Sequence, residues 1–138
     1  MIYFSVYNQT TGEIINSGYV PTQDMYEAQI VDPGFIKVPV ESDAATQYFQ
    51  NSVVVNMPAK PDYECHFDFI TKQWVLDYDV QAAIIKSRRN ALLIASDWTQ
   101  LADVPITNKD AWAQYRQALR DIPEQSGYPT SVVWPTSP

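Results

Sequence analysis

The chain has 138 residues, of which 46% are hydrophobic and 13% aromatic, and its formal net charge at pH 7 is −7. This composition is that of a globular protein with one modest core or two small ones, and it excludes the disordered and fibrous classes. No apolar run is long enough to cross a bilayer, and the first residues lack the basic segment of a secretory signal, so we expect folding in a cytoplasm.

The charge is divided unevenly along the chain. Residues 1–78 carry three lysines against ten acidic residues, whereas residues 79–138 carry six basic residues, including every arginine, against six acidic ones. This distribution predicts no binding to nucleic acid, which needs clustered positive charge. The single cysteine, Cys65, permits no internal disulfide and indicates a reducing compartment.

The N-terminal residues predict a β-hairpin. Residues 1–8 alternate in polarity, with Ile2, Phe4 and Val6 on the face that we expect to be buried. Turn-forming residues follow, and residues 13–20 then return as the partner strand.

The next segment mixes irregular and regular structure. Residues 21–33 are polar and predicted irregular, and residues 35–40 form a strand that Pro39 places at a sheet edge or a strand end. Ser42 or Asp43 would cap a short helix over residues 44–49, and Asn51 would end that helix. Residues 53–55 predict another short strand.

A break at residues 58–61, which contains two prolines, is the best candidate linker. Residues 64–69 and 73–76 after it predict a second hairpin. Cys65, Phe67 and Phe69 share the strand face that we expect to be buried.

From residue 79 the polarity follows a helical period. Residues 79–96 predict an amphipathic helix with Asp79 as N-cap. Its apolar stripe consists of Val80, Ile84, Ala91 and Ala95, widened by Leu92.

A capping-box pattern at residues 107–110 begins a second helix, which ends at Pro123 and packs on the first as a hairpin. Residues 127–138 are proline-rich and predict an extended tail over the surface, anchored by Val133 and Trp134.

These elements predict an α+β protein, with a small antiparallel β region followed by a helical hairpin and an extended proline-rich tail. The predicted parts are residues 1–59, a β region; residues 60–78, a β-hairpin; and residues 79–138, a helical module.

Catalytic and metal chemistry find little support in the sequence. Glu64, His66 and Asp68 share a strand face, but without a second ligand cluster we interpret them as a solvated face. Cys65 cannot pair with His66 as a nucleophile, because adjacent strand residues point to opposite faces. No phosphate loop or nucleophile elbow is present, so the sequence predicts no enzyme, no metal and no cofactor.

Aspartates, arginines and aromatic residues are concentrated in the helical part. Two of the three aspartates Asp97, Asp103 and Asp121 would serve polysaccharide cleavage only across a sugar-sized groove, which so short a chain does not suggest. We expect Asp97 instead to cap a helical turn or to pair with one of three arginines, Arg88, Arg116 or Arg120. Trp98, Trp112, Tyr115 and Trp134 have two interpretations, as core residues or as interface residues. We favour the core for Trp98 and Trp112 and a partner surface for Trp134.

The order of residues in the last third of the chain supports a resemblance. The pattern consists of Arg88-Arg89, Leu92-Leu93, Ser96-Asp97-Trp98-Thr99-Gln100, Asp103-Val104-Pro105, Trp112, Tyr115-Arg116, Leu119-Arg120-Asp121-Ile122-Pro123, Tyr128-Pro129 and Val133-Trp134-Pro135. It resembles the C-terminal module of bacteriophage tail assembly chaperones, also called tail fibre assembly proteins. Several fixed spacings make this pattern more specific than a single short motif.

The resemblance implies a protein that binds a tail-fibre polypeptide in the host bacterial cytoplasm and assists its folding, trimerisation or attachment. The alternative is a structural component that stays on the tail or fibre tip of the virion and contributes to receptor contact. The candidate partner-binding residues are Trp98, Trp112, Tyr115, Arg116, Arg120 and Trp134. No membrane partner is expected.

Overall fold

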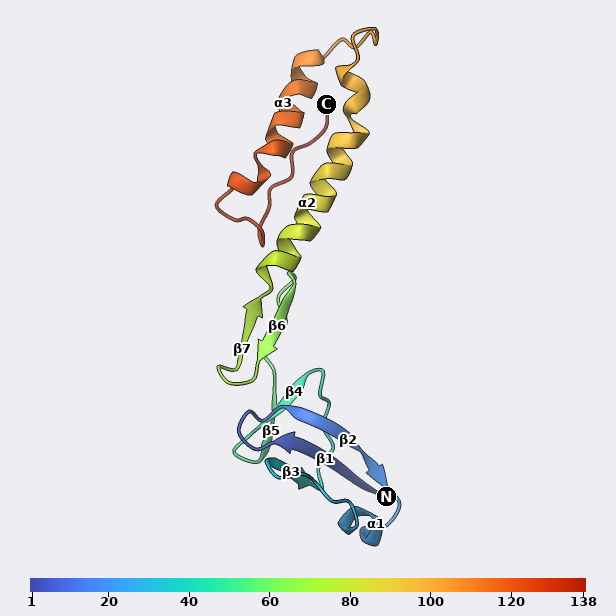
Figure 1. The fold of residues 1–138 in the computed structure, drawn as a ribbon, viewed down its shortest axis with the longest axis vertical. Coiled ribbons are helices and arrows are strands. Elements are labelled where there is room, and N and C mark those ends of the chain that lie inside the picture. The colour runs from blue at the N-terminus through green and yellow to red at the C-terminus, as the bar shows by residue number, and fades with distance from the viewer. The chain divides into compact units, whose positions relative to one another are not determined.

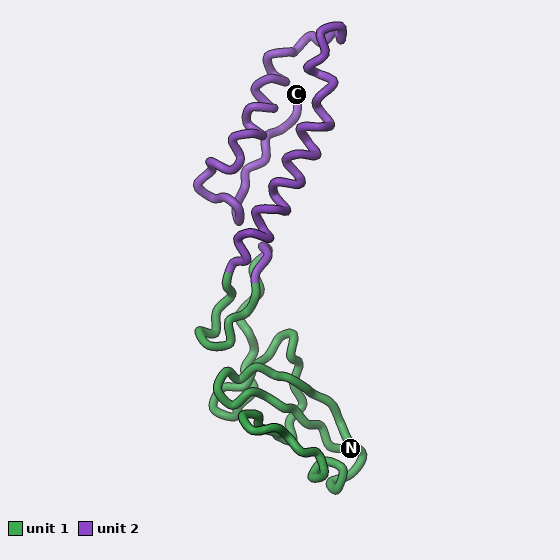
Figure 2. The backbone as a smooth tube through the Cα atoms, in the orientation of Figure 1, with its two compact units in different colours: residues 1–61, 66–75 green, residues 62–65, 76–138 purple.

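The computed structural model describes all 138 residues and confirms the α+β class. The chain divides into two compact units (Figure 2). Unit 1 comprises residues 1–61 and 66–75, and unit 2 comprises residues 62–65 and 76–138. The finer division into residues 1–59, 60–78 and 79–138 stays a prediction.

Unit 1 contains a three-stranded sheet in the order β2-β1-β3 (Figure 1). β1 (Ile2–Asn8) pairs antiparallel with β2 (Ile14–Val20), with a register irregularity between Val6 and Tyr7. β3 (Phe35–Val38) pairs antiparallel with the other side of β1. The N-terminal hairpin and the edge position of the third strand are therefore confirmed.

The prediction of the buried face of β1 is only partly right. Phe4 is buried, but Ile2 and Val6 are only partly covered, whereas Ser5 and Tyr7 on the other face are 0% and 4% exposed. The face that carries Ser5 and Tyr7 is covered by segments distant in the sequence: Ser5 Oγ lies 2.6 Å from Val40 O and Ser42 Oγ, and Tyr7 stacks on Phe49. Alternating polarity assumes one solvated face, and these contacts bury the face that was expected to be solvated.

The predicted helix over residues 44–49 is wrong. The chain there forms β4 (Gln47–Gln50), which pairs antiparallel with β5 (Val53–Asn56). Asn51 and Ser52 both have positive φ, at 51° and 64°, and make the tight turn between the strands. The Asp43 carboxylate accepts from Ala45 N and Thr46 Oγ1, so it holds a turn before β4 instead of capping a helix.

A short helix occurs instead in the segment predicted to be irregular. α1 (Gln23–Glu27) begins after Thr22, whose Oγ1 accepts a hydrogen bond from Met25 N. Lys37 of β3 donates to the carbonyls of Tyr26 and Gln29 and thereby ties α1 to the sheet.

The core of unit 1 forms where the β4–β5 hairpin lies on the sheet. Tyr7 and Phe49 stack with their ring centroids 4.2 Å apart, and Ile14 completes the cluster. Gly12, at φ 71°, lies in the β1–β2 turn and accepts a hydrogen bond from Phe49 N. A Cβ at position 12 would lie 1.9 Å from Phe49 O, so this contact requires glycine.

The second predicted hairpin is also present. β6 (Cys65–Asp68) and β7 (Gln73–Leu76) form a two-stranded sheet, and Cys65 and Phe67 are buried as expected. The turn between the strands depends on Asp68, which accepts from the backbone of Ile70. That hydrogen bond, with one from the Thr71 hydroxyl, lowers the pKa of Asp68 below its usual value.

Unit 2 is a helical hairpin, as predicted. Its elements are α2 (Tyr78–Ala95), the 3₁₀ turn η1 (Asp97–Gln100), α3 (Lys109–Arg120) and the 3₁₀ turn η2 (Ile122–Glu124). Ile85, Tyr115, Leu119 and Ile122 form the buried core between the helices. No helix in the structure is both long enough and apolar enough to span a membrane.

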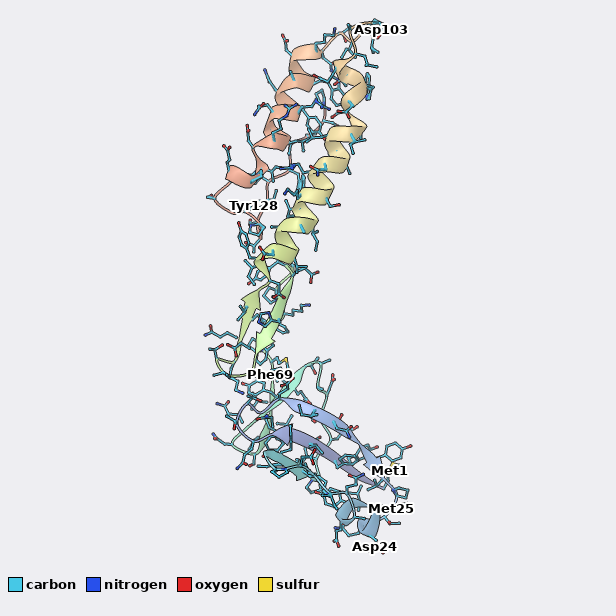
Figure 3. All side chains as sticks on the ribbon, in the orientation of Figure 1. Met1, Asp24, Met25, Phe69, Asp103 and Tyr128 are labelled. Atoms are coloured by element: carbon cyan, nitrogen blue, oxygen red, sulfur yellow. The ribbon has the colours of Figure 1, made fainter.

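The C-terminal tail runs between α2 and α3 (Figure 1). It turns near Tyr128, which lies at the opposite end of the hairpin from Asp103 in the η1–α3 loop (Figure 3). The Tyr128–Pro129 peptide is cis, and Pro129 is fully buried. The prediction that Val133 anchors the tail is wrong, because this residue is 76% exposed and its neighbour Val132 packs on the core instead.

The prediction of which face of α2 is buried is wrong. Val80 and Ile84 are 55% and 47% exposed, and Ala91 and Ala95 are exposed too. Ile85 is the buried residue of α2 instead, because its side of the helix packs against α3 and the tail.

The helix starts also differ from the prediction. α2 begins at Tyr78, so Asp77 and not Asp79 occupies the N-cap position. α3 begins after Asn108, and no side chain makes a capping hydrogen bond there, so the predicted capping box does not form.

We expect Gly12→Ala to destabilise unit 1 by more than about 3 kcal/mol, because it adds a steric collision to an unfavourable positive φ. Gly34→Ala is the matched control: Gly34 has φ 95°, but a Cβ there would meet no atom within 4 Å, so backbone strain alone should cost about 1–2 kcal/mol. Chemical denaturation followed by circular dichroism, with hydrogen exchange to localise the loss, measures both. Equal losses would contradict this account of Gly12.

Candidate partner-binding site

All six predicted contact residues lie in unit 2, but the structure places them at different depths. Trp98 is 45% exposed and Arg120 is exposed, Trp112 and Trp134 are partly buried, and Tyr115 and Arg116 are each 8% exposed. The six residues therefore include surface groups and the groups that support them.

Three aromatic rings connect the surface of unit 2 to its core. The centroids of Trp98 and Trp112 are 5.6 Å apart, and those of Trp112 and Tyr115 are 5.7 Å apart, both pairs edge to face. Edge-to-face pairs of this kind contribute about 0.5–1.5 kcal/mol beyond their burial. Trp98 is thus held in one orientation while almost half of its surface stays in solvent.

Arg116 binds the C-terminal end of α2 from α3. Its Nη1 donates to Leu93 O at 2.6 Å and to Ser96 Oγ at 2.7 Å, and its Nη2 donates to Asp97 Oδ1 at 2.8 Å. The last carbonyls of a helix lack partners within the helix and carry partial negative charge, so a cation there is favourable. The arginine thereby joins the two helices at the point where α2 ends.

The motif Ser96-Asp97-Trp98-Thr99-Gln100 supplies the rest of this helix end. Ser96, which is 2% exposed, donates through Oγ toward Leu92 O and Leu93 O at 2.9 and 3.0 Å. Thr99 Oγ1 donates to Ser96 O at 2.7 Å and accepts from Gln100 Nε2 at 2.8 Å. The motif stops α2 and turns the chain toward α3.

Asp97 pairs with Arg116, which is one of the partners expected for it. The Asp97 side chain is 61% exposed whereas that of Arg116 is 9% exposed, so solvent screens the pair on one side. Arg116 Nε is buried without a hydrogen-bond partner. The hydrogen bonds from Nη1 to α2 therefore contribute more to the position of this arginine than the ion pair does.

Trp134 is held against the hairpin by two kinds of contact. It packs against the core cluster of unit 2, and the guanidinium of Arg88 lies 4.2 Å from its ring centroid. Just before it, Gln125 Nε2 donates to Val133 O and Gln125 Oε1 accepts from Val133 N, at 2.9 and 2.8 Å. These contacts fix the tail along the helices.

Two exposed apolar side chains close to Trp98 in the sequence were not among the six predicted contact residues. Ile94 is 70% exposed one turn before Trp98, and Leu101 is 54% exposed just after η1. Their spacing from Trp98 of four and three residues is the signal that could have identified them. With Trp98 they are three exposed apolar side chains within a short stretch of sequence at this end of the hairpin.

Unit 1 contains a separate hollow of about 380 Å³ with a mostly polar lining, beside the β1–β2 turn. Lys72 is its one cation, and its Nζ donates to Thr11 O and Phe69 O and lies 4.6 Å from the ring centroid of Tyr48. Burial lowers the pKa of Lys72. Its ammonium group therefore joins two turns of unit 1, which is a structural role.

No group of three or more His, Cys, Asp or Glu side chains is arranged to hold a metal ion. His66 of the predicted strand face is exposed, and Asp68 serves the β6–β7 turn.

Unit 2 is therefore a helical-hairpin module of an α+β chain, with an arginine at the helix end and a tail between the helices. Residues 82–138 match the family model of the phage tail assembly chaperone protein. The match falls on the C-terminal segment that carries the resemblance in the sequence, and it confirms that resemblance. No curated protein and no solved structure gives a significant match to the chain.

We expect Arg116→Met to lower the free energy of unfolding of unit 2 by about 2–4 kcal/mol, because it removes the charged hydrogen bonds to α2 and keeps only the apolar stem. Asp97→Asn should cost under about 1 kcal/mol, since that carboxylate is largely in solvent. Denaturant titration followed by tryptophan fluorescence suits the comparison, because three of the four tryptophans lie in unit 2. A larger loss in Asp97→Asn would show that the ion pair, and not the helix end, positions Arg116.

Proposed function

We propose that this chain binds a tail-fibre polypeptide during phage assembly in the host bacterial cytoplasm and assists its folding, trimerisation or attachment. The family match over residues 82–138 carries the proposal. It falls on a unit in which Ile94, Trp98 and Leu101 are exposed and the Trp98 ring packs edge to face on Trp112. An assembly chaperone acts by binding, so the proposal needs no catalytic group.

The physical task is to cover surface that an immature fibre exposes. Apolar patches and unpaired strand edges associate nonspecifically until their partners are in place. A chaperone that offers a fixed apolar surface competes with that association and is displaced when the fibre completes its own contacts. Trp98 suits this task because its ring is oriented by Trp112 before any partner binds.

Within the six predicted residues we propose a division of roles. Trp98 and Arg120, which are exposed, contact the partner directly. Trp112, Tyr115 and Arg116 hold Trp98 and the helix end before it, and Trp134 holds the tail against the hairpin.

We expect Trp98→Ser to reduce the soluble fraction of a co-expressed tail-fibre polypeptide at least about threefold, because it removes an aromatic residue of the kind that dominates binding hot spots. Val133→Ser is the matched control: it also removes an exposed apolar side chain from unit 2, but at a distance from the proposed surface along the chain. Circular dichroism establishes that both variants fold. If Trp98→Ser leaves fibre solubility unchanged, the aromatic surface is not the binding site.

The same fibre provides the test of the function as a whole. Deletion of the gene should leave fibres insoluble, and mass spectrometry of purified particles should not find the chain. If purified particles instead contain the chain at a fixed ratio to the fibre protein, the chain is a retained tail component and not a transient chaperone.

A further inference from the structure

The outer edge of β2 has no partner within the chain. β2 pairs only with β1, and no other segment makes a backbone hydrogen bond with residues 15–20 (Figure 1). We propose that this edge binds an extended segment of the partner polypeptide as an added strand, with basic side chains on the face of Glu41 and apolar side chains on the opposite face. The inference adds a second contact surface to the proposed function, on which it rests for the presence of a partner polypeptide.

The two edges of the three-stranded sheet differ in their protection against pairing. β3 has only four residues, carries Lys37 and is followed by Pro39, and these are features with which proteins keep an edge from pairing. β2 has seven residues, of which none is charged and none is proline. Its register irregularity lies near its start and leaves residues 16–20 as a regular run. The row of N–H and C=O groups along such an edge matches another extended backbone, which identifies a strand as the occupant.

One face of β2 carries a small hollow suited to a cation. The hollow has a volume of about 170 Å³, and Tyr3, Tyr19 and Glu41 are among its lining residues. The two tyrosine rings are 41% and 59% exposed, and their centroids lie 6.2 Å apart. Ser5 makes hydrogen bonds of 2.6 Å to the residues on both sides of Glu41, whose own carboxylate is exposed and has no partner in the chain. A free carboxylate beside aromatic rings attracts an ammonium or guanidinium group.

The opposite face of β2 carries a larger and mostly apolar hollow. Its volume is about 310 Å³, and its lining includes Ile15, Ile30 and Phe35, with Asp32 as the one charged residue. Ile30 is 97% exposed and Ile15 is 52% exposed, so both are available to a partner. Successive side chains of a strand point to opposite faces, so a strand added to β2 directs every second side chain toward each hollow. The two linings therefore predict a segment in which basic and apolar residues alternate.

The charge of unit 1 argues against a second copy of this chain as the occupant. Unit 1 has seven acidic residues and three lysines. All three lysines are engaged within the unit: Lys37 and Lys72 donate to backbone carbonyls, and Lys60 Nζ lies 5.9 Å from the ring centroid of Trp74. Two copies paired through β2 would bring together two units of like charge. A basic segment of another polypeptide is instead attracted.

Two nine-residue peptides test the proposal on the full chain. Both have valine at every second position, and the positions between are lysine in one peptide and glutamate in the other, so repulsion keeps each peptide from pairing with itself. We expect the lysine peptide to bind at least about tenfold more tightly at low salt, with the difference shrinking at about 0.5 M salt. Equal binding of the two peptides, or binding of neither, would overturn the proposal.

Methylation of alternate backbone nitrogens in the lysine peptide separates strand addition from a general attraction of charges. An added strand turns every second N–H group toward β2 and the others away from it. Methylation of one alternate set should therefore weaken binding at least about tenfold, whereas methylation of the other set should change the Kd by less than about threefold. Equal effects of the two sets contradict pairing at a strand edge.

Matched variants locate the bound peptide on the chain. Glu41→Lys should weaken binding of the lysine peptide at least about tenfold, because it places a like charge beside the basic face of the added strand. Glu124→Lys makes the same change of charge at an exposed position of unit 2 and should change the Kd by less than about twofold. Circular dichroism establishes that both variants fold. Equal effects of the two variants would show that net charge attracts the peptide, and would reject the proposal.

Sedimentation of the free chain decides between a partner strand and a second copy. We expect no dimer through the edge of β2. A dimer that the lysine peptide dissociates would make a second copy the occupant and overturn the proposal.

Solubility of the co-expressed fibre separates this inference from the proposed function. If neither peptide binds while the chain still keeps the fibre soluble, this inference alone fails. If the lysine peptide binds as described but fibre solubility does not depend on the chain, the proposed function fails and the strand-binding edge stands.

Discussion

The hydrogen bonds from Arg116 to the C-terminal end of α2 are the contact on which the helical unit depends. The helix must stop and the chain must reverse within a few residues, and the carbonyls exposed by that reversal need donors. One guanidinium provides them from the neighbouring helix and at the same time sets the distance between α2 and α3. The aromatic ladder from Trp98 to Tyr115 can then form beside it.

This arrangement gives many of the polar residues of the C-terminal motif a structural role. Ser96 and Thr99 are almost fully buried, and their hydroxyls are used to complete the end of a helix. Arg88, which looks like a surface cation in the sequence, lies over the ring of Trp134 and holds the tail. A motif of this kind specifies a shape, and the binding that we propose would use the side chains that the shape leaves in solvent.

The elements of the fold could be predicted from the sequence better than the faces they bury. The period of residues 79–96 identified a helix correctly, but α2 is apolar on two sides, and only the position of α3 and the tail decides that Ile85 points inward and Ile84 outward. Asp43 gave a local capping signal, whereas Tyr48 and Phe49 form a strand because β5 pairs with them and Phe49 stacks on Tyr7. Similarly, the sequence identified Arg116 but could not assign it to the end of α2, because that contact joins residues 20 and 23 positions apart. Contacts between segments that are far apart in the sequence decide these outcomes, and a local sequence pattern carries no information about such contacts.

The burial of Cys65 has a practical consequence for the study of motion in this molecule. The thiol is the only one in the chain and is 8% exposed in β6. A reagent that alkylates thiols can therefore react only when the strand opens locally. The rate at which this single sulfur atom is labelled reports that opening. No engineered reporter is needed, because the wild-type chain already carries one probe at one defined place.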